Sequence, residues 1–112
     1  MVTIGAERSA FEAIADPTRR KILDLVRARE MRAGDLAARF TVSRPAIAKH
    51  VRVLREAGLL RERREATQRF YTLEPKALES VDRWLAPYRL FWASRLMDLK
   101  HVVEEAAKTR TK

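Results

Sequence analysis

The chain has 112 residues, a formal net charge of +9 and a pI of about 10.8. This length suits one domain with a modest core, and it excludes a buried catalytic cleft combined with a cofactor domain. The sequence has no cysteine, which excludes disulfides, thiolate nucleophiles and cysteine metal sites. With no signal-peptide or transmembrane pattern, we expect a soluble cytoplasmic protein without a membrane partner.

The first forty residues predict three short helices. The first covers about residues 9–15 and carries Phe11 on its apolar face. The second begins at Asp16, a good N-cap followed by a proline, and ends near residue 29. Residues 32–35 interrupt the pattern, and the third helix is predicted over residues 36–40.

The next segment predicts a short helix with one apolar seam and one basic side. Ser43 is its N-cap, and Gly58 suits a left-handed C-cap. Together with the preceding short helix it forms a predicted helix-turn-helix over residues 34–57. Residues 41–72 hold eight Arg and Lys against three Glu, which favours a polyanionic partner. The alternative is an ordinary amphipathic surface helix.

A hairpin is predicted over residues 59–74. Its two strands flank Ala66 and Thr67, and the second is rich in aromatic and β-branched residues. The turn has no glycine, so we expect it to be longer than two residues and mobile. The alternative for the hairpin's cations is a solvated edge that resists aggregation.

A long helix is predicted over residues 75–107, opened by Pro75 and followed by a disordered tail, 108–112. Pro87 should kink it, or split it near Ala86. Its large apolar residues exceed what a small domain can cover, which favours a homodimer. The alternatives are a core helix wrapping its own domain and a ligand pocket lined by its aromatic residues. The predicted dimer interface comprises Phe11, Leu78, Val81, Leu85, Tyr88, Phe91, Trp92, Leu96, Leu99 and Val103.

Five segments follow one another in an order typical of one known family: Ala15–Leu23, Ser43–Val51, Leu54–Leu60, Arg63–Glu65 and Tyr71–Leu73. On these segments the chain resembles the ArsR/SmtB family of small dimeric winged-helix repressors over nearly its whole length. The resemblance implies a mainly α (α+β) fold: a winged helix-turn-helix with a two-stranded β-wing and a long C-terminal dimerisation helix, as one domain over residues 1–112. It also implies a homodimer that places two recognition helices in successive major grooves of a pseudo-palindromic operator.

The resemblance also suggests which residues meet double-stranded DNA. The helix supplies some of them, and the hairpin would reach the flanking backbone or the minor groove. His50 either contacts a phosphate or base edge, or packs beside the preceding helix. The predicted DNA-binding residues are Ser43, Arg44, Pro45, Ala46, Lys49, His50, Arg52, Arg55, Arg63, Arg64, Thr67, Gln68 and Arg69.

The metal sites of the family are incomplete in this sequence. Arsenic-sensing members carry Cys-Val-Cys where this chain has residues 32–34. Zinc-type members use two half-sites, and only the second is matched here, by His101 and Glu104. Two protein ligands are too few for a closed zinc site, so no metal and no cofactor are predicted.

These observations predict a sequence-specific DNA-binding regulator, acting as a homodimeric repressor. The alternatives are a non-specific nucleic-acid-binding or architectural protein and a winged helix used only for protein contacts. An enzyme is not expected, because the serines have no base partner and no glycine-rich phosphate loop exists. Three alternatives stay open for what relieves repression: an apolar small molecule bound between the terminal helices, a partner protein, or the abundance of the protein itself.

Overall fold

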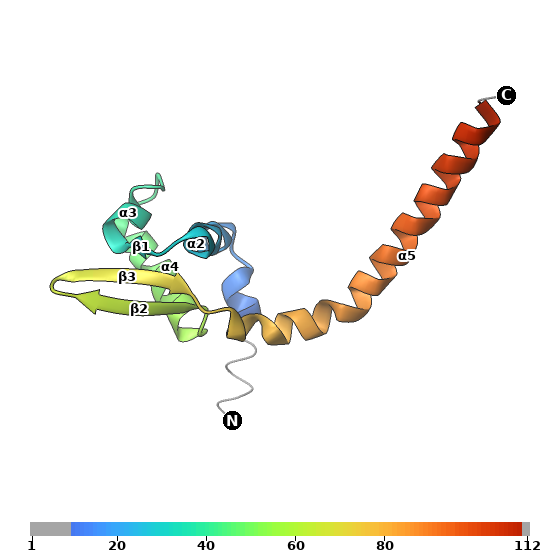
Figure 1. Cartoon of the computed structure of the whole chain (residues 1–112). Helices are drawn as coiled ribbons and strands as arrows, with labels where there is room; N and C mark the ends of the chain where they lie inside the picture. Colours follow the sequence, from blue (N-terminus) through green and yellow to red (C-terminus); the bar gives the residue numbers. More distant parts are fainter. Residues whose placement is uncertain (1–9, 111–112) are drawn as a thin grey trace. The chain divides into compact units, whose positions relative to one another are not determined.

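The computed structural model describes residues 10–110 and divides the chain into two units, Met1–Val81 and Asp82–Lys112 (Figure 1). It confirms the predicted winged helix-turn-helix. The first unit opens with a helical turn at residues 10–14, whose predicted start, Ser9, lies outside the described residues. Its further elements are α2 (Pro17–Ala28), β1 (Met31–Arg32), α3 (Ala33–Ala37), α4 (Arg44–Glu56), β2 (Leu60–Glu65), β3 (Gln68–Leu73) and the 3-10 helix η1 (Pro75–Leu78).

The predicted helix caps are present. The Asp16 carboxylate accepts the backbone N–H of Arg19 at 3.0 Å at the start of α2. The Ser43 hydroxyl accepts the backbone N–H of Ala46 at 3.3 Å at the start of α4. Beyond the other end of α4, Gly58 has a φ of +77°, a conformation that only glycine adopts without strain.

The sheet has three antiparallel strands in the order β1-β3-β2: strands β2 and β3 form the predicted two-stranded wing, and β1 adds a strand that the sequence did not predict. The extra strand, β1, pairs Met31 with Tyr71, and two residues are too few to show alternation in the sequence. The predicted longer turn between β2 and β3 is wrong. Pairing continues to Glu65 and Gln68, because Ala66 takes a φ of 55° and closes a two-residue loop without glycine.

The third helix also begins earlier than predicted. It covers Ala33–Ala37 rather than residues 36–40, because the chain enters α3 directly from β1. The Arg32 guanidinium donates to the Asp35 carboxylate at 3.1 Å across this junction. Phe40, beyond the helix, packs against the core and carries the Lys21 ammonium 5.0 Å from the centre of its ring.

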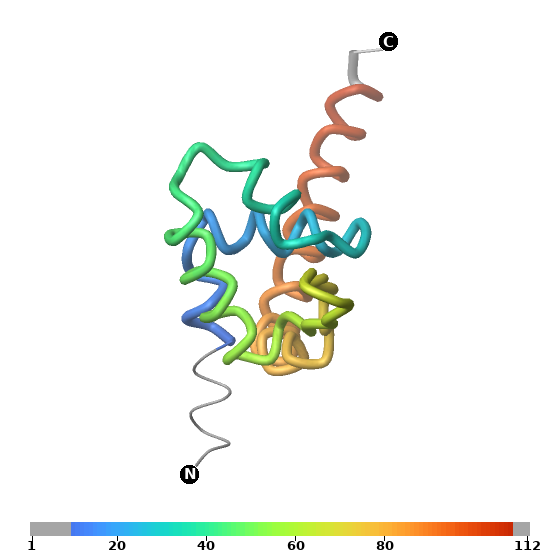
Figure 2. Tube along the Cα trace, turned by 90° about the vertical axis from the view of Figure 1, so that its left-hand side faces the viewer, coloured from blue at the N-terminus to red at the C-terminus, as the bar shows by residue number. Residues whose placement is uncertain are grey.

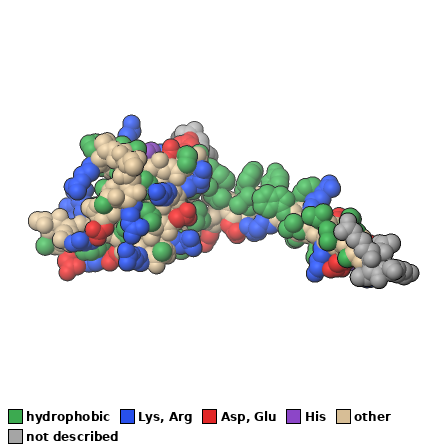
Figure 3. All heavy atoms as spheres, turned by 90° about the horizontal axis from the view of Figure 1, so that it is seen from above, with side chains coloured by type: hydrophobic (Ala, Val, Ile, Leu, Met, Phe, Trp, Pro, Cys, Tyr) green, Lys and Arg blue, Asp and Glu red, His purple; other side chains and the backbone are tan. Residues whose placement is uncertain are grey.

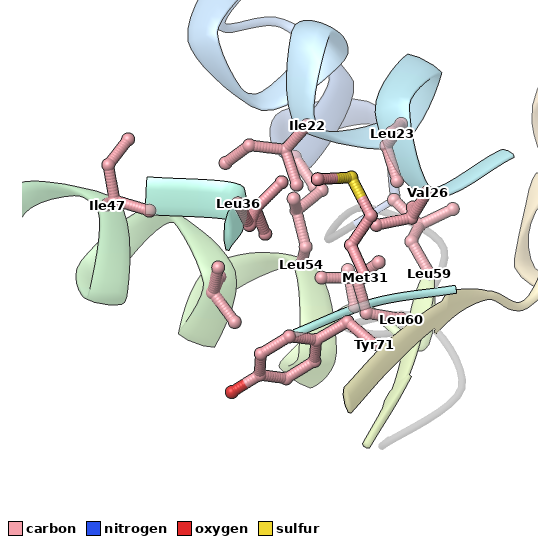
Figure 4. Close-up of a cluster of buried hydrophobic side chains, with 13 residues drawn as sticks. Ile22, Leu23, Val26, Met31, Leu36, Ile47, Leu54, Leu59, Leu60 and Tyr71 are labelled. Carbon is pink, nitrogen blue, oxygen red and sulfur yellow. The ribbon is translucent and has the colours of Figure 1, made fainter. Parts of the chain in front are cut away.

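The core of the first unit lies between the helices and the sheet (Figure 4). Helix α2 packs on α4 (Figure 2) and on β3. Ile22, Leu36, Leu54 and Leu59 are the largest fully buried side chains. Because each comes from a different segment, the core fixes α4 against α2, α3 and the wing. The basic side of α4 is thereby directed outward.

Helix α5 (Glu79–Arg110) begins in the first unit, at residues 79–81, and its remaining residues make up the described part of the second unit. It continues through Pro87, so the predicted split near Ala86 is wrong. Of the predicted disordered tail, residues 108–110 are helical, and residues 111–112 lie outside the described residues. No helix within residues 10–110 is both long enough and apolar enough to cross a bilayer.

Candidate nucleic-acid interface

Helix α4 exposes cations on the side opposite its buried seam. Ile47, Val51 and Leu54 face the core. Arg44, Pro45, Lys49, Arg52 and Arg55 are exposed, and Ser43 is exposed just before them, while Ala46 is half-buried. The exposed first turn is therefore small and basic, which suits entry into a groove lined by phosphates.

His50 differs from its exposed neighbours on α4. It is half-buried, and its Nδ1 atom lies 3.2 Å from Nη1 of Arg19 on α2. The structure places the His50 ring against α2, and not against α3, the helix that directly precedes α4. Arg19 also donates its own backbone N–H to Asp16, and this bond is the main cause that holds the pKa of the Asp16 carboxyl below its usual value.

A carboxylate organises the junction between α4 and the wing. Glu62 on β2 has only 11 % of its side chain exposed, and it accepts the Tyr71 hydroxyl at 3.0 Å. It also lies 3.4 Å from a guanidinium nitrogen of Arg55 and 3.5 Å from one of Arg64. Burial opposes ionisation of Glu62, but the Tyr71 bond and the charge of Arg55 outweigh it, so the pKa of Glu62 lies below its usual value.

Arg63 is held inside the protein's own ion-pair network. Its guanidinium donates to both oxygens of Glu30, at 2.9 and 3.2 Å, and to Glu65 at 2.7 Å. It also lies 4.3 Å from the centre of the Phe70 ring. Arg63 is one of the predicted DNA contacts. In the structure its charge is compensated by these two carboxylates, and it anchors the wing.

The tip of the wing is open. Thr67 lies in the two-residue loop, and Gln68 and Arg69 begin β3, all three exposed. The structure brings these residues together with Arg64 on one hairpin, as the sequence predicted. Arg64 and Arg69 continue the basic surface from α4 onto the wing.

Sequence analysis missed the acidic partners of this surface, Glu30 and Glu62. Glu30 lies 33 positions from Arg63 in the chain, so no local pattern connects them. Glu62 stands directly opposite Tyr71 in the β2–β3 register. A correct register would have revealed that pair, because facing residues of antiparallel strands interact.

The predicted dimer residues divide between the two units. Leu78 packs against the core of the first unit, and Val81 is buried, so both are covered within the chain itself. Phe11, in the helical turn at residues 10–14, is 36 % exposed. Hydrophobic side chains gather along α5 (Figure 3). There Leu85 is half-buried, and the exposed ones are Tyr88, Phe91, Trp92, Leu96, Leu99 and Val103.

His101 and Glu104, the matched half of a zinc site, both lie exposed on α5. Within the part of the chain that the structure describes, no three His, Asp or Glu side chains gather as metal ligands do.

Known proteins share both the sequence pattern and the fold. Residues 16–62 match the family described as "Bacterial regulatory protein, arsR family". The chain is 39 % identical over 77 residues to the transcriptional repressor SdpR of Bacillus subtilis, covering 69 % of this chain and 86 % of that protein. It is 37 % identical over 81 residues to the HTH-type transcriptional regulator Rv2034 of Mycobacterium tuberculosis, covering 72 % and 76 %.

Among solved structures, an ArsR-like transcriptional regulator from Rhodococcus sp. RHA1 matches 91 % of this chain and 96 % of its own. The TM-score is 0.66, and the sequences are 31 % identical. The matched segments include α2, α3 and α4, the elements that present the basic surface described above. The chain belongs to the ArsR family of bacterial regulatory proteins.

Proposed function

We propose that the chain is a sequence-specific DNA-binding transcriptional repressor whose helix α4 reads the major groove of its operator. The observation that carries the proposal is the exposed, basic first half of α4, held rigid by a buried seam on its other side. A helix fixed in this way presents the same side chains to every site, which base recognition requires. Family membership and the repressor named among its relatives support the assignment.

The basic residues divide into two roles. Arg44 stands at the first position of α4, where a bidentate contact to guanine is within reach of a helix that enters the groove by its N-terminus. Lys49, Arg52, Arg55 and Arg64 are placed to neutralise phosphates and release counterions. The first role supplies the choice of sequence, and the second supplies affinity that falls with salt. A protein that acts on bacterial DNA in this way works in the cytoplasm.

The repressor is proposed to act as a homodimer joined through α5. Trp92 is 61 % exposed and Leu96 is 66 % exposed in the single chain, and water would contact both. A second copy offers the same apolar face and can bury it symmetrically. Two copies of α4 would then meet half-sites about 10 base pairs apart.

Footprinting on genomic fragments tests whether the protein recognises a specific DNA sequence. A protected pseudo-palindrome upstream of a promoter, bound at least about 1,000-fold more tightly than random DNA, supports the repressor. Uniform coating with the same affinity for every fragment would instead assign the non-specific, architectural function.

Sedimentation of the full chain tests the dimer. The wild type should sediment as a dimer at micromolar concentration, and Trp92→Glu should sediment as a monomer, because a charge cannot be buried in an apolar interface without a partner. Lys100→Glu, an exchange of one charge for another on the same helix, is the matched control and should stay dimeric. A monomeric wild type would overturn this part of the proposal.

A further inference from the structure

A hollow of about 320 Å³ opens between α3, α4 and β3, on the side of the unit where the wing meets the basic helix. Its floor is apolar. Leu36, Ile47, Val51 and Tyr71 line it, and all four are buried in the core. This volume lies at the lower end of the range for small-molecule sites.

The hollow exists because the residues around it are small. Ala33, Gly34, Ala37 and Ala48 line its walls, where larger side chains would fill the space between the two helices. A Cβ atom added at Gly34 would meet no atom within 4 Å. A second hollow, of about 310 Å³, shares Ala33, Gly34 and Arg69 and runs toward Thr67 and Gln68 at the wing tip.

The walls of the hollow also carry four arginines: Arg44, Arg52, Arg55 and Arg69. Glu62 lies beside Arg55, but Arg44 and Arg52 form no ion pair with any residue among 10–108. Several guanidinium groups around one opening raise its positive potential and attract an anion. Their forked donors match a carboxylate or a related planar oxyanion.

We propose that this hollow is a binding site for a small organic anion with a flat apolar body, such as an aromatic carboxylate. The apolar body would lie on Val51 and Tyr71, and the carboxylate would meet Arg52 and Arg69 at the opening. A bare phosphate would make no apolar contact with the floor, and a neutral aromatic would leave the arginines unused. The two halves of the hollow together therefore select an amphipathic anion.

The same site would couple the ligand to DNA. Arg44, Arg52 and Arg55 lie both on the wall of the hollow and on the proposed DNA surface, so a bound anion would occupy donors that DNA phosphates require. Ligand and operator would exclude each other by direct competition. This second step rests on the proposed function, whereas the binding step does not.

The binding step is tested on the full chain without DNA, by calorimetry with 2-naphthoate and by amide NMR. We expect one 2-naphthoate per chain and shifted amide signals in residues 33–37, 48–55 and 69–71. Neutral 2-naphthamide and inorganic phosphate should each bind at least about tenfold more weakly. Equal binding of phosphate would identify a simple phosphate cradle and overturn the proposal, and equal binding of the amide would overturn the role of the arginines.

Gly34 provides a matched pair of variants. Because Gly34 lines the hollow, Gly34→Leu adds a large side chain at its wall and should weaken 2-naphthoate binding about tenfold or more. Gly34→Ala adds only a Cβ into open space and should change the affinity less than about twofold. Circular dichroism of both variants verifies the fold. Binding that survives Gly34→Leu unchanged in a folded protein would place the ligand elsewhere, for example on α5, and would overturn the proposal.

The competition step uses the operator found by footprinting. Naphthoate should displace it from the wild type and not from Gly34→Leu, which keeps every proposed DNA contact. Binding of naphthoate without displacement of DNA would overturn the exclusion alone. Failure to find an operator would overturn the proposed function and leave the calorimetric result intact, so the two failures are distinguishable.

Discussion

Nη1 of Arg19 lies 3.2 Å from Nδ1 of His50, and this contact joins α2 to the helix that presents the basic surface. A guanidinium only donates, so Nδ1 of His50 is the acceptor in this contact. The Arg19 guanidinium also donates to the carbonyl oxygens of Ala13, at 2.7 Å, and Glu12, at 3.0 Å. One arginine therefore ties three segments of the first unit together.

Loss of this arginine should destabilise the first unit. We expect Arg19→Ala to lower the free energy of unfolding by about 1–3 kcal/mol, because two part-buried acceptors, the Ala13 carbonyl and the His50 ring, lose their charged donor. The matched control is Arg20→Ala, whose exposed guanidinium bonds to the carbonyls of Ile14 and Ala15 and should cost less than about 1 kcal/mol. Urea unfolding followed by circular dichroism measures both. Equal losses in the two variants would show that the contact to His50 contributes nothing.

Arg44 and Lys49 should differ in what they contribute to DNA binding. Arg44→Ala should cost about 1–3 kcal/mol on the operator and relax the preference at one base pair, if its guanidinium reads a guanine. Lys49→Ala should weaken operator and random DNA alike and lower the salt slope by about one. Affinities on a set of single-base operator variants at several salt concentrations measure both effects. The same loss on every sequence for both variants would contradict this division.

Neighbouring arginines of the wing should separate structure from DNA contact. Arg63 is paired with Glu30 and Glu65, whereas Arg64 has a single, longer contact with Glu62. We therefore expect Arg64→Ala to lower the salt slope of DNA binding by about one and to leave the unfolding curve unchanged. Arg63→Ala should shift the unfolding curve instead and leave the salt slope within error. The opposite result would place Arg63 on DNA.

The sequence was most informative where structure is local. Asp16 and Ser43 cap their helices as predicted, because a cap depends on residues within one turn. Ile22, Ile47 and Leu54 are buried as their spacing predicts.

Features that depend on contacts between distant segments could not be predicted from the sequence. Strand β1 exists only because β3 is there to pair with it, and its two residues carry no periodic pattern of their own. Likewise, the pairing of Arg63 with Glu30 needs the hairpin to return to the end of α2. The prediction of Arg63 as a DNA contact did not include this partner.

The wing turn offers a site for stabilisation. Ala66 has a φ of 55°, where a side chain is strained, and glycine is not. Ala66→Gly should therefore raise the free energy of unfolding by about 0.5–1 kcal/mol. The matched control is Thr67→Gly, at a position without a positive φ, which should lower it through the added freedom of the unfolded chain. If Ala66→Gly also destabilises in urea unfolding, the turn is not strained.

Glu62 should make the stability of the first unit depend on acid pH. Its pKa is lower in the folded state than the unfolded value of about 4.3, so unfolding takes up a proton as the pH falls through this range. The stabilisation from the charge is complete above that value and is lost as the pH falls through the lowered folded value. Glu62→Gln removes it and should cost about 1–2 kcal/mol at neutral pH.

Unfolding curves from about pH 3 to pH 7 measure this effect. The gap between wild type and Glu62→Gln should be widest near neutrality and close toward the acid end, because protonated Glu62 and Gln are both neutral. Tyr71→Phe removes the hydrogen bond at 3.0 Å but leaves the arginines around the carboxylate. The difference in unfolding free energy between wild type and Tyr71→Phe should therefore close only in part toward acid pH. Glu56→Gln, at an exposed position of α4, should follow the wild type. A gap that stays constant with pH would mean that packing, and not the charge of Glu62, holds Arg55 and Arg64 in place.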